Sequence, residues 1–265
     1  MNRVKTRPKD ISPRRAGDSD SREGLLLAAL PDAERRRLLA ACEPVELVFG
    51  TILCKQGARI RHVYFPTGGF ISLLAQLDTR PGLEVGLVGA EGAVGISLVL
   101  GVNIAPVTAV VQGAGAALRI QATRFTAELD RSPALRAVMS RYLYVLVTQL
   151  AAMASCTRFH VVEARLARWL MMTRDRAGSD EFYLTQEFMA YMLGVRRVGV
   201  SGAARVLRAR RLIRYSRGSM QILDATGLEG ASCSCYATAR DSYARFMRPS
   251  PRISRSIGVL PVTVR

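Results

Sequence analysis

The chain has 265 residues, of which 49% are hydrophobic and 22% charged, a globular composition that excludes an intrinsically disordered protein. Its formal net charge of +17 favours a polyanionic partner, with nucleic acid first, and an anionic membrane surface or a generally Arg-rich proteome as alternatives. No stretch holds the ~20 uninterrupted apolar residues of a membrane helix. The N-terminus lacks the apolar core of a secretory signal, and the five cysteines form no paired framework. We therefore expect a cytoplasmic protein with no membrane partner.

The first part of the chain changes character twice. Residues 1–22 are polar, charged and punctuated by Pro and Gly, so we predict a disordered basic arm. The composition of residues 25–41 predicts two short helical pieces, separated by a break at Pro31.

Short runs rich in Val, Ile, Leu, Phe and Thr follow between Val45 and Ile120, separated by turns that contain glycine. Strands at this spacing predict a small antiparallel barrel or sandwich, and we assign residues 23–131 to it. None of the glycines forms a strand–GxGxxG–helix unit, so the sequence does not support a nucleotide-binding Rossmann motif.

After Ser132-Pro133 the apolar pattern becomes helical, and residues 132–158 predict one long helix. Its apolar seam steps by four, three, four, three and four residues, as in a coiled coil. The seam consists of Leu135, Met139, Tyr142, Leu146, Gln149 and Met153. A two-fold dimerisation helix and an intramolecular core helix both explain this pattern.

The C-terminal part carries a helix-turn-helix pattern, after a helix over about Val161–Arg174 that holds the lone Trp169. Thr185 is a good N-cap for a first short helix, and Gly194 suits the sharp turn after it. A second helix is expected from about Arg197, and two strands joined at residues 217–219 would form a wing.

This region is strongly basic. Between Glu187 and Asp224 there is no acidic residue but there are eight arginines, which is typical of a surface that contacts phosphates. They are Arg196, Arg197, Arg205, Arg208, Arg210, Arg211, Arg214 and Arg217.

A β-roll, a long helix and a winged helix-turn-helix, in that order over residues 25–230, resemble the CRP/FNR family of bacterial transcription regulators. The resemblance implies an α+β fold and a homodimer that binds duplex DNA and contacts RNA polymerase. It implies a winged helix-turn-helix domain at 159–230 and leaves 231–265 as a C-terminal extension. The DNA-contacting residues that it implies are Arg196, Arg197, Ser201, Arg205, Arg214 and Arg217.

The sequence departs from this family in two places. Gly199 and Gly202 interrupt the second helix, at ~1 kcal/mol of helix propensity each, and Gly202 removes a side chain where the family commonly contacts a base. In the effector site, Val107, followed by Thr108, stands where the phosphate-binding Arg would be, and Ile96 or Ser97 replaces the ribose-binding Glu. We therefore expect no response to cAMP.

Other chemistry has little support in the sequence. Cys233 and Cys235 form a C-x-C pair, but Cys42, Cys54 and Cys156 are scattered, so no metal or other cofactor is expected. His62 and His160 each stand alone, and no catalytic constellation is recognisable, which argues against an enzyme. A sensor module with a non-transcriptional output and a basic RNA-binding protein are the alternative functions.

Overall fold

The computed structural model describes residues 24–76 and 82–247. The arm predicted at 1–22 and the end of the C-terminal extension lie outside these residues. Two short helices open the described chain, α1 (Leu25–Ala28) and α2 (Asp32–Ala40), with Pro31 at the N-cap of the second, as predicted.

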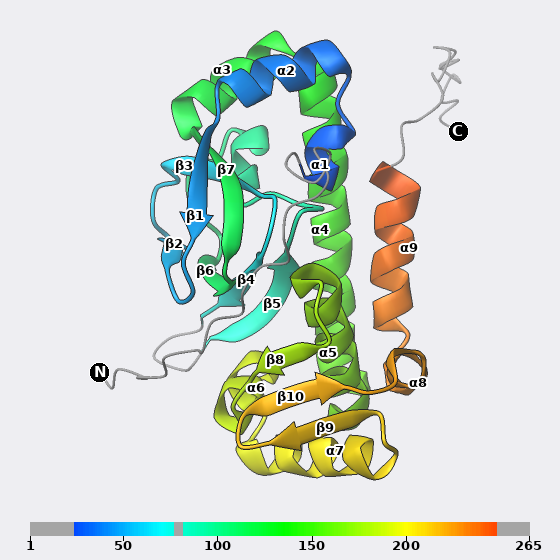
Figure 1. Cartoon of the computed structure of the whole chain (residues 1–265). Helices are drawn as coiled ribbons and strands as arrows, with labels where there is room; N and C mark the ends of the chain where they lie inside the picture. Colours follow the sequence, from blue (N-terminus) through cyan, green and yellow to red (C-terminus); the bar gives the residue numbers. More distant parts are fainter. Residues whose placement is uncertain (1–23, 77–81, 248–265) are drawn as a thin grey trace, which may run out of the picture.

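A β-roll follows, built from two antiparallel sheets that face each other (Figure 1). One sheet has the strand order β1-β7-β3 and the other β2-β6-β4-β5. The strands are β1 (Glu43–Leu47), β2 (Ile52–Cys54), β3 (His62–Pro66), β4 (Phe70–Ala75), β5 (Leu83–Val88), β6 (Thr108–Gly113) and β7 (Gly115–Gln121). A 3-10 helix, η2 (Ile96–Leu100), joins β5 to β6. Each strand overlaps a run that the sequence predicted, although β1 begins before Val45 and β7 ends after Ile120.

Two helices leave the roll, α3 (Ala122–Arg131) and the long α4 (Pro133–Phe159). Ser132 caps α4, since its hydroxyl accepts a hydrogen bond from the Leu135 amide at 3.1 Å, and Pro133 occupies the first turn. By length and composition alone α4 could cross a membrane. It lies instead along the roll on one side and against the C-terminal helix α9 (Cys235–Met247) on another (Figure 1).

The structure corrects the expectation that the apolar seam of α4 forms a dimer contact. Leu135, Met139, Tyr142 and Met153 are buried within the chain itself, and Leu146 and Gln149 line a cavity of the roll. The seam therefore faces the core of its own chain. A different stripe of α4 is exposed, and it also steps by four and three residues: Ser140, Tyr144, Val147, Ala151 and Ala154. Val147, and Leu150 beside the stripe, also line that cavity.

The C-terminal unit combines helices with a small sheet of order β8-β10-β9. Its elements are α5 (Val162–Ala177), β8 (Glu181–Tyr183), α6 (Gln186–Leu193), α7 (Arg197–Ala209), β9 (Ile213–Ser216), β10 (Ser219–Ile222) and α8 (Ala225–Ala231). Trp169 on α5 lies at the centre of its core, 1% exposed, together with Met189, Val200 and Leu207.

The chain then turns back, and α9 lies beside α4 (Figure 1). Phe246 on α9 packs against Tyr144 on α4 with ring centroids 4.8 Å apart, and Met247 joins the core of the roll. The sequence did not predict this helix.

Candidate DNA interface and effector cavity

The helix-turn-helix is formed by α6 and α7. The Thr185 hydroxyl accepts the Phe188 amide hydrogen bond at 3.1 Å and so caps α6, and Gly194 ends this helix with a φ of 62°, as the sequence predicted. At this turn the buried guanidinium of Arg165 donates a hydrogen bond to the Leu193 carbonyl. This bond satisfies a free carbonyl at the end of α6 and fixes the angle at which α7 leaves.

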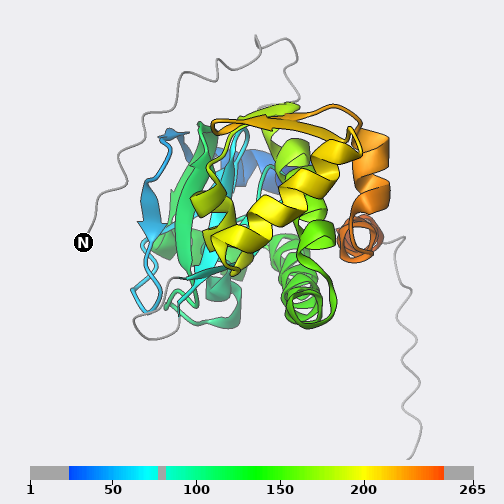
Figure 2. The same ribbon diagram turned by 90° about the horizontal axis from the view of Figure 1, so that it is seen from below.

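One face of α7 is buried and the other is open. Val200, Ala203, Ala204 and Leu207 face the core. Figure 2, seen from below, shows α7 lying across the lower surface of the molecule with no other element in front of it. An exposed, basic helix of 13 residues has the dimensions to enter a major groove of about 12 Å width.

The arginines of this surface fall into two groups. Arg210 forms an ion pair with Glu163 at 3.1 Å, and Arg214 donates to the Gln221 side chain at 2.9 Å. The others are exposed and, within residues 24–76 and 82–247, form no ion pair with a carboxylate: Arg196, Arg197, Arg205, Arg208, Arg211 and Arg217. The unpaired group is free to contact phosphates or bases.

Ser201 differs from the arginines. Its hydroxyl donates to the Gln186 side chain at 2.7 Å and lies 3.0 Å from the Arg197 carbonyl, so it ties the start of α6 to α7. Both hydrogen bonds are internal, which gives the residue a positioning role in the unbound protein. Gly202, one residue on, faces open space.

The wing turn has the geometry of a tight hairpin. Arg217 has a φ of 48° and Gly218 a φ of 88°, which are the two positive values of a type I′ turn between β9 and β10. Arginine rarely occupies this conformation, so its presence at the tip costs stability. Arg217 is exposed at this tip of the wing.

Val198 is a residue of this surface that the sequence analysis missed. It lies at the start of α7 and is 75% exposed, although it is apolar. An apolar side chain at the entry of a recognition helix can contact the methyl group of thymine. The sequence does show a valine outside the buried positions of this helix, but a single exposed valine is weak evidence for a DNA contact.

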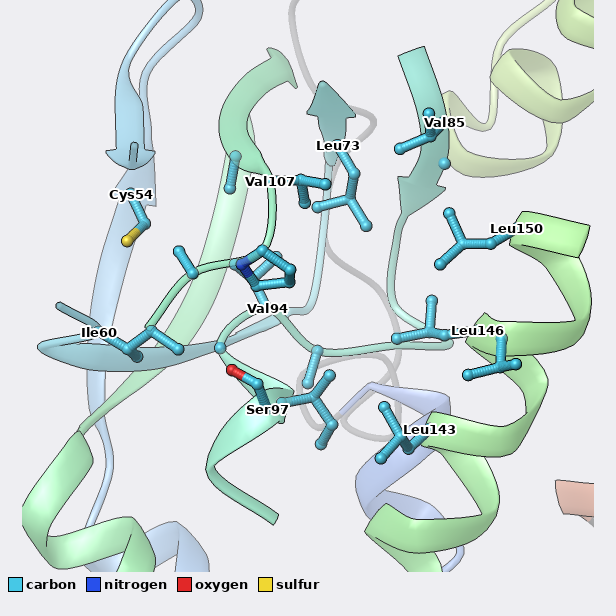
Figure 3. Close-up of a pocket in the computed structure, with 18 of the residues that line it drawn as sticks. Cys54, Ile60, Leu73, Val85, Val94, Ser97, Val107, Leu143, Leu146 and Leu150 are labelled. Carbon is cyan, nitrogen blue, oxygen red and sulfur yellow. The ribbon is translucent and has the colours of Figure 1, made fainter. Parts of the chain in front are cut away.

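A second candidate site is a cavity of about 160 Å³ between the roll and α4 (Figure 3). Val85 and Val107 come from the roll side, while Leu143, Leu146 and Leu150 come from α4. None of the described residues that line it is Arg, Lys, Asp or Glu. The pKa of His62, which also lines the cavity, is lowered by burial and by the nearby charge of Arg119, which favours the neutral ring.

The residues expected in the effector site are brought together only in part. Ile96, Ser97 and Val107 line the cavity, and the Ser97 hydroxyl donates to the Ile104 carbonyl at 3.3 Å. Thr108 is not among the lining residues: its hydroxyl accepts a hydrogen bond from the Gln56 amide at 3.0 Å. The lining thus offers apolar contact and no cation for a phosphate.

Known proteins resemble the chain most clearly at its C-terminal end. The family described as "Crp-like helix-turn-helix domain" matches residues 164–231. The chain carries a Crp-like helix-turn-helix domain. This domain comprises α5 to α8, so the family match and the geometry of α6 and α7 agree on the same segment. No curated protein matches the sequence.

Solved structures extend the likeness to the β-roll and α4. A protein from Eubacterium rectale described as a transcriptional regulator of the CRP/FNR family covers 78% of this chain and 97% of its own, with 17% identity and a TM-score of 0.63. The c-di-GMP responsive global regulator CLP of Xanthomonas campestris covers 72% and 99%, with 17% identity and a TM-score of 0.60. A CRP/FNR regulator from Thermus thermophilus covers 72% and 98%, with 18% identity and a TM-score of 0.60. Together with the Crp-like domain, the β-roll and α4 therefore give the chain the α+β fold of CRP/FNR transcription regulators. The roll is of the cyclic-nucleotide-binding-like type.

Proposed function

We propose that the protein is a transcription regulator that binds duplex DNA through α7 and the wing. The observation that carries this proposal is the open face of α7, on which Arg197 and Arg205 have no acidic partner in the described chain, next to the strained tip of the wing at Arg217. Arginines at the entry of a recognition helix can pair with guanine bases, whereas a wing arginine contacts the phosphate backbone of the DNA.

We propose further that the protein acts as a homodimer. The exposed stripe of α4, centred on Val147, is apolar and has the coiled-coil step of four and three residues. Two such helices side by side would place two copies of α7 on one side of the dimer, which suits a pseudo-palindromic site. RNA polymerase is the expected partner of the DNA-bound dimer.

The effector of such a regulator would not be cAMP. Val107 offers no charge to a phosphate in an uncharged cavity, and burial of a phosphate without a cation is costly. Isothermal titration calorimetry with cAMP and cGMP should give no binding heat at physiological concentrations. Micromolar affinity for either nucleotide would contradict this assignment.

Selection from a random pool tests the DNA-binding proposal. Purified protein should enrich one duplex motif, with two related half-sites, from a pool of random duplexes. It should bind this motif far more tightly than a scrambled duplex or a single-stranded RNA of equal length. Equal affinity for the RNA and the duplex would support the alternative of a basic RNA-binding protein and contradict our proposal.

A further inference from the structure

Four side chains with metal-binding atoms meet where α4 ends and α9 begins. Cys156 and His160 lie one helical turn apart at the C-terminal end of α4, and Cys233 and Cys235 lie between the end of α8 and the start of α9. One ligand atom from each residue lies within 4.8 Å of all the others. We propose that these residues bind a single Zn²⁺ ion through three thiolates and one imidazole.

Two distances within this cluster match those of one tetrahedral ion. The sulfur atoms of Cys156 and Cys233 are 3.6 Å apart, and the Cys235 sulfur lies 3.6 Å from Nδ1 of His160. Zinc bonds of about 2.3 Å to sulfur and about 2.0 Å to nitrogen place tetrahedral ligand atoms roughly 3.5–3.8 Å apart. The two sulfurs are too far apart for a disulfide, whose bond is about 2.05 Å long. A four-iron cluster would need a wider opening, since each cysteine binds a different iron atom.

The backbone holds the ligands in this arrangement. Cys156 lies in the last turn of α4 and His160 is the residue that caps this helix, so both lie at its C-terminal end. The Cys233 amide donates to the Ala164 carbonyl of α5 at 3.3 Å, and Cys235 begins α9 directly after the exposed Ser234. Cys156 and Cys233 are buried, whereas His160 and Cys235 are partly exposed and leave a path for the ion.

A buried cation beside the cluster favours an anionic centre. Arg168 is 5% exposed, and its guanidinium donates to the sulfur atoms of Met153 and Met172, at 3.3 Å each. It forms no ion pair in the described part of the chain, although the Glu84 carboxyl also feels its charge. Three thiolates, one neutral imidazole and Zn²⁺ sum to a net charge of −1, which would balance Arg168.

Such an ion would fasten two parts of the molecule together. Cys156 belongs to α4, which packs on the β-roll, and His160 caps this helix, whereas the other two ligands follow α8, which packs on α5 of the Crp-like domain. The family match ends at residue 231, so Cys233 and Cys235 lie directly beyond it. The zinc would hold α9 along α4 and fix the Crp-like domain relative to the roll. This proposal does not depend on DNA binding.

Metal analysis of the full chain tests the site. Protein purified from zinc-containing medium without chelators should contain about one zinc ion per chain. Inductively coupled plasma mass spectrometry measures this content. Cys42→Ser, which alters a cysteine outside the cluster, should keep this content, and Cys235→Ser should lose most of it. Because Cys235 is partly exposed, its loss should leave the far-UV circular dichroism of the fold intact. His160→Cys should still bind zinc, as a four-cysteine site.

Cobalt replacement and hydrogen exchange give readouts that a structural role of the cysteines alone would not produce. Co²⁺ in place of zinc should give thiolate-to-cobalt absorption and a tetrahedral ligand-field spectrum, both weakened in Cys235→Ser. Removal of the metal should speed amide exchange in α9. The proposal is overturned if natively folded wild type binds no zinc, if Cys235→Ser binds as much, if iron and sulfide are found, or if Cys156 and Cys233 form a disulfide instead.

Discussion

Trp169 donates its indole N–H to the buried carboxyl of Glu84 at 2.7 Å, and this bond joins α5 of the Crp-like domain to β5 of the roll. The Ser72 hydroxyl donates to the same carboxyl, also at 2.7 Å. Burial raises the pKa of Glu84 from 4.5 to about 7, although both donors and the charges of Arg168 and Arg176 act in the opposite direction. A carboxyl at the contact between the two parts therefore changes its charge near neutral pH.

This shift predicts a pH-dependent stability. Because the folded pKa lies above the unfolded one, the contribution of Glu84 is fully present below pH 4.5 and is lost as the pH rises through about 7. The loss amounts to about 3 kcal/mol at ~1.4 kcal/mol per pKa unit. Glu84→Gln should remove this dependence, because the amide stays neutral. Denaturant unfolding of both proteins between pH 5 and pH 8 measures it, and parallel pH curves for the two would contradict the prediction.

The dimer proposal predicts that Val147→Asp yields monomers. Val147 is 57% exposed in the single chain, although it also lines the cavity, and a charge there opposes the pairing of two apolar stripes. Val48→Asp is the matched control, because Val48 is 54% exposed in the loop between β1 and β2. Light scattering should give half the mass for the first variant and an unchanged mass for the second. A dimer of unchanged mass in Val147→Asp would exclude this stripe as the interface.

Replacement of Gly202 by alanine is expected to stabilise the protein. A Cβ atom added there meets nothing within 4 Å, and the residue lies inside α7. Gly202→Ala should therefore raise the free energy of unfolding by about 0.5–1 kcal/mol, because alanine loses less backbone entropy in a helix. Thermal and denaturant unfolding check this value. A destabilised variant would mean that the backbone at Gly202 is not free to carry a side chain.

Local sequence patterns predicted much of the fold. The runs rich in Val, Ile, Leu, Phe and Thr and the glycine turns located the strands of the roll, and Thr185 and Gly194 placed the ends of α6. The sequence left two interpretations of the α4 seam open, because a heptad step identifies an apolar stripe without saying which chain covers it, and the structure has the seam covered by its own chain. Leu135 and Val147 lie on two different stripes of the same helix.

Features that depend on contacts between distant parts of the chain could not be predicted from local sequence patterns. Cys156 and Cys233 are 77 residues apart, so their meeting follows only from the return of α9 along α4. Glu84 and Glu91 flank a Gly-rich segment of the sequence, which is the pattern of solvated carboxylates. Glu84 is buried because Trp169 covers it from a distant part of the chain.

The central claim, that α7 reads base sequence while the wing contacts the backbone, rests on different roles for three arginines. Arg197 opens α7, Arg217 lies at the wing tip, and Arg210 is held by Glu163. The variants are Arg197→Ala, Arg217→Asn, since asparagine tolerates a positive φ, and Arg210→Ala as the ion-paired control.

Paired titration of selected and random duplex at several salt concentrations is the most direct measurement of this claim. Arg197→Ala should lower the preference for the selected site by about 1–3 kcal/mol. Arg217→Asn should weaken both duplexes equally and reduce the salt slope by about one unit, and Arg210→Ala should change little. A preserved preference in Arg197→Ala, with a lost preference in Arg217→Asn, would contradict the assignment of α7 as the recognition helix.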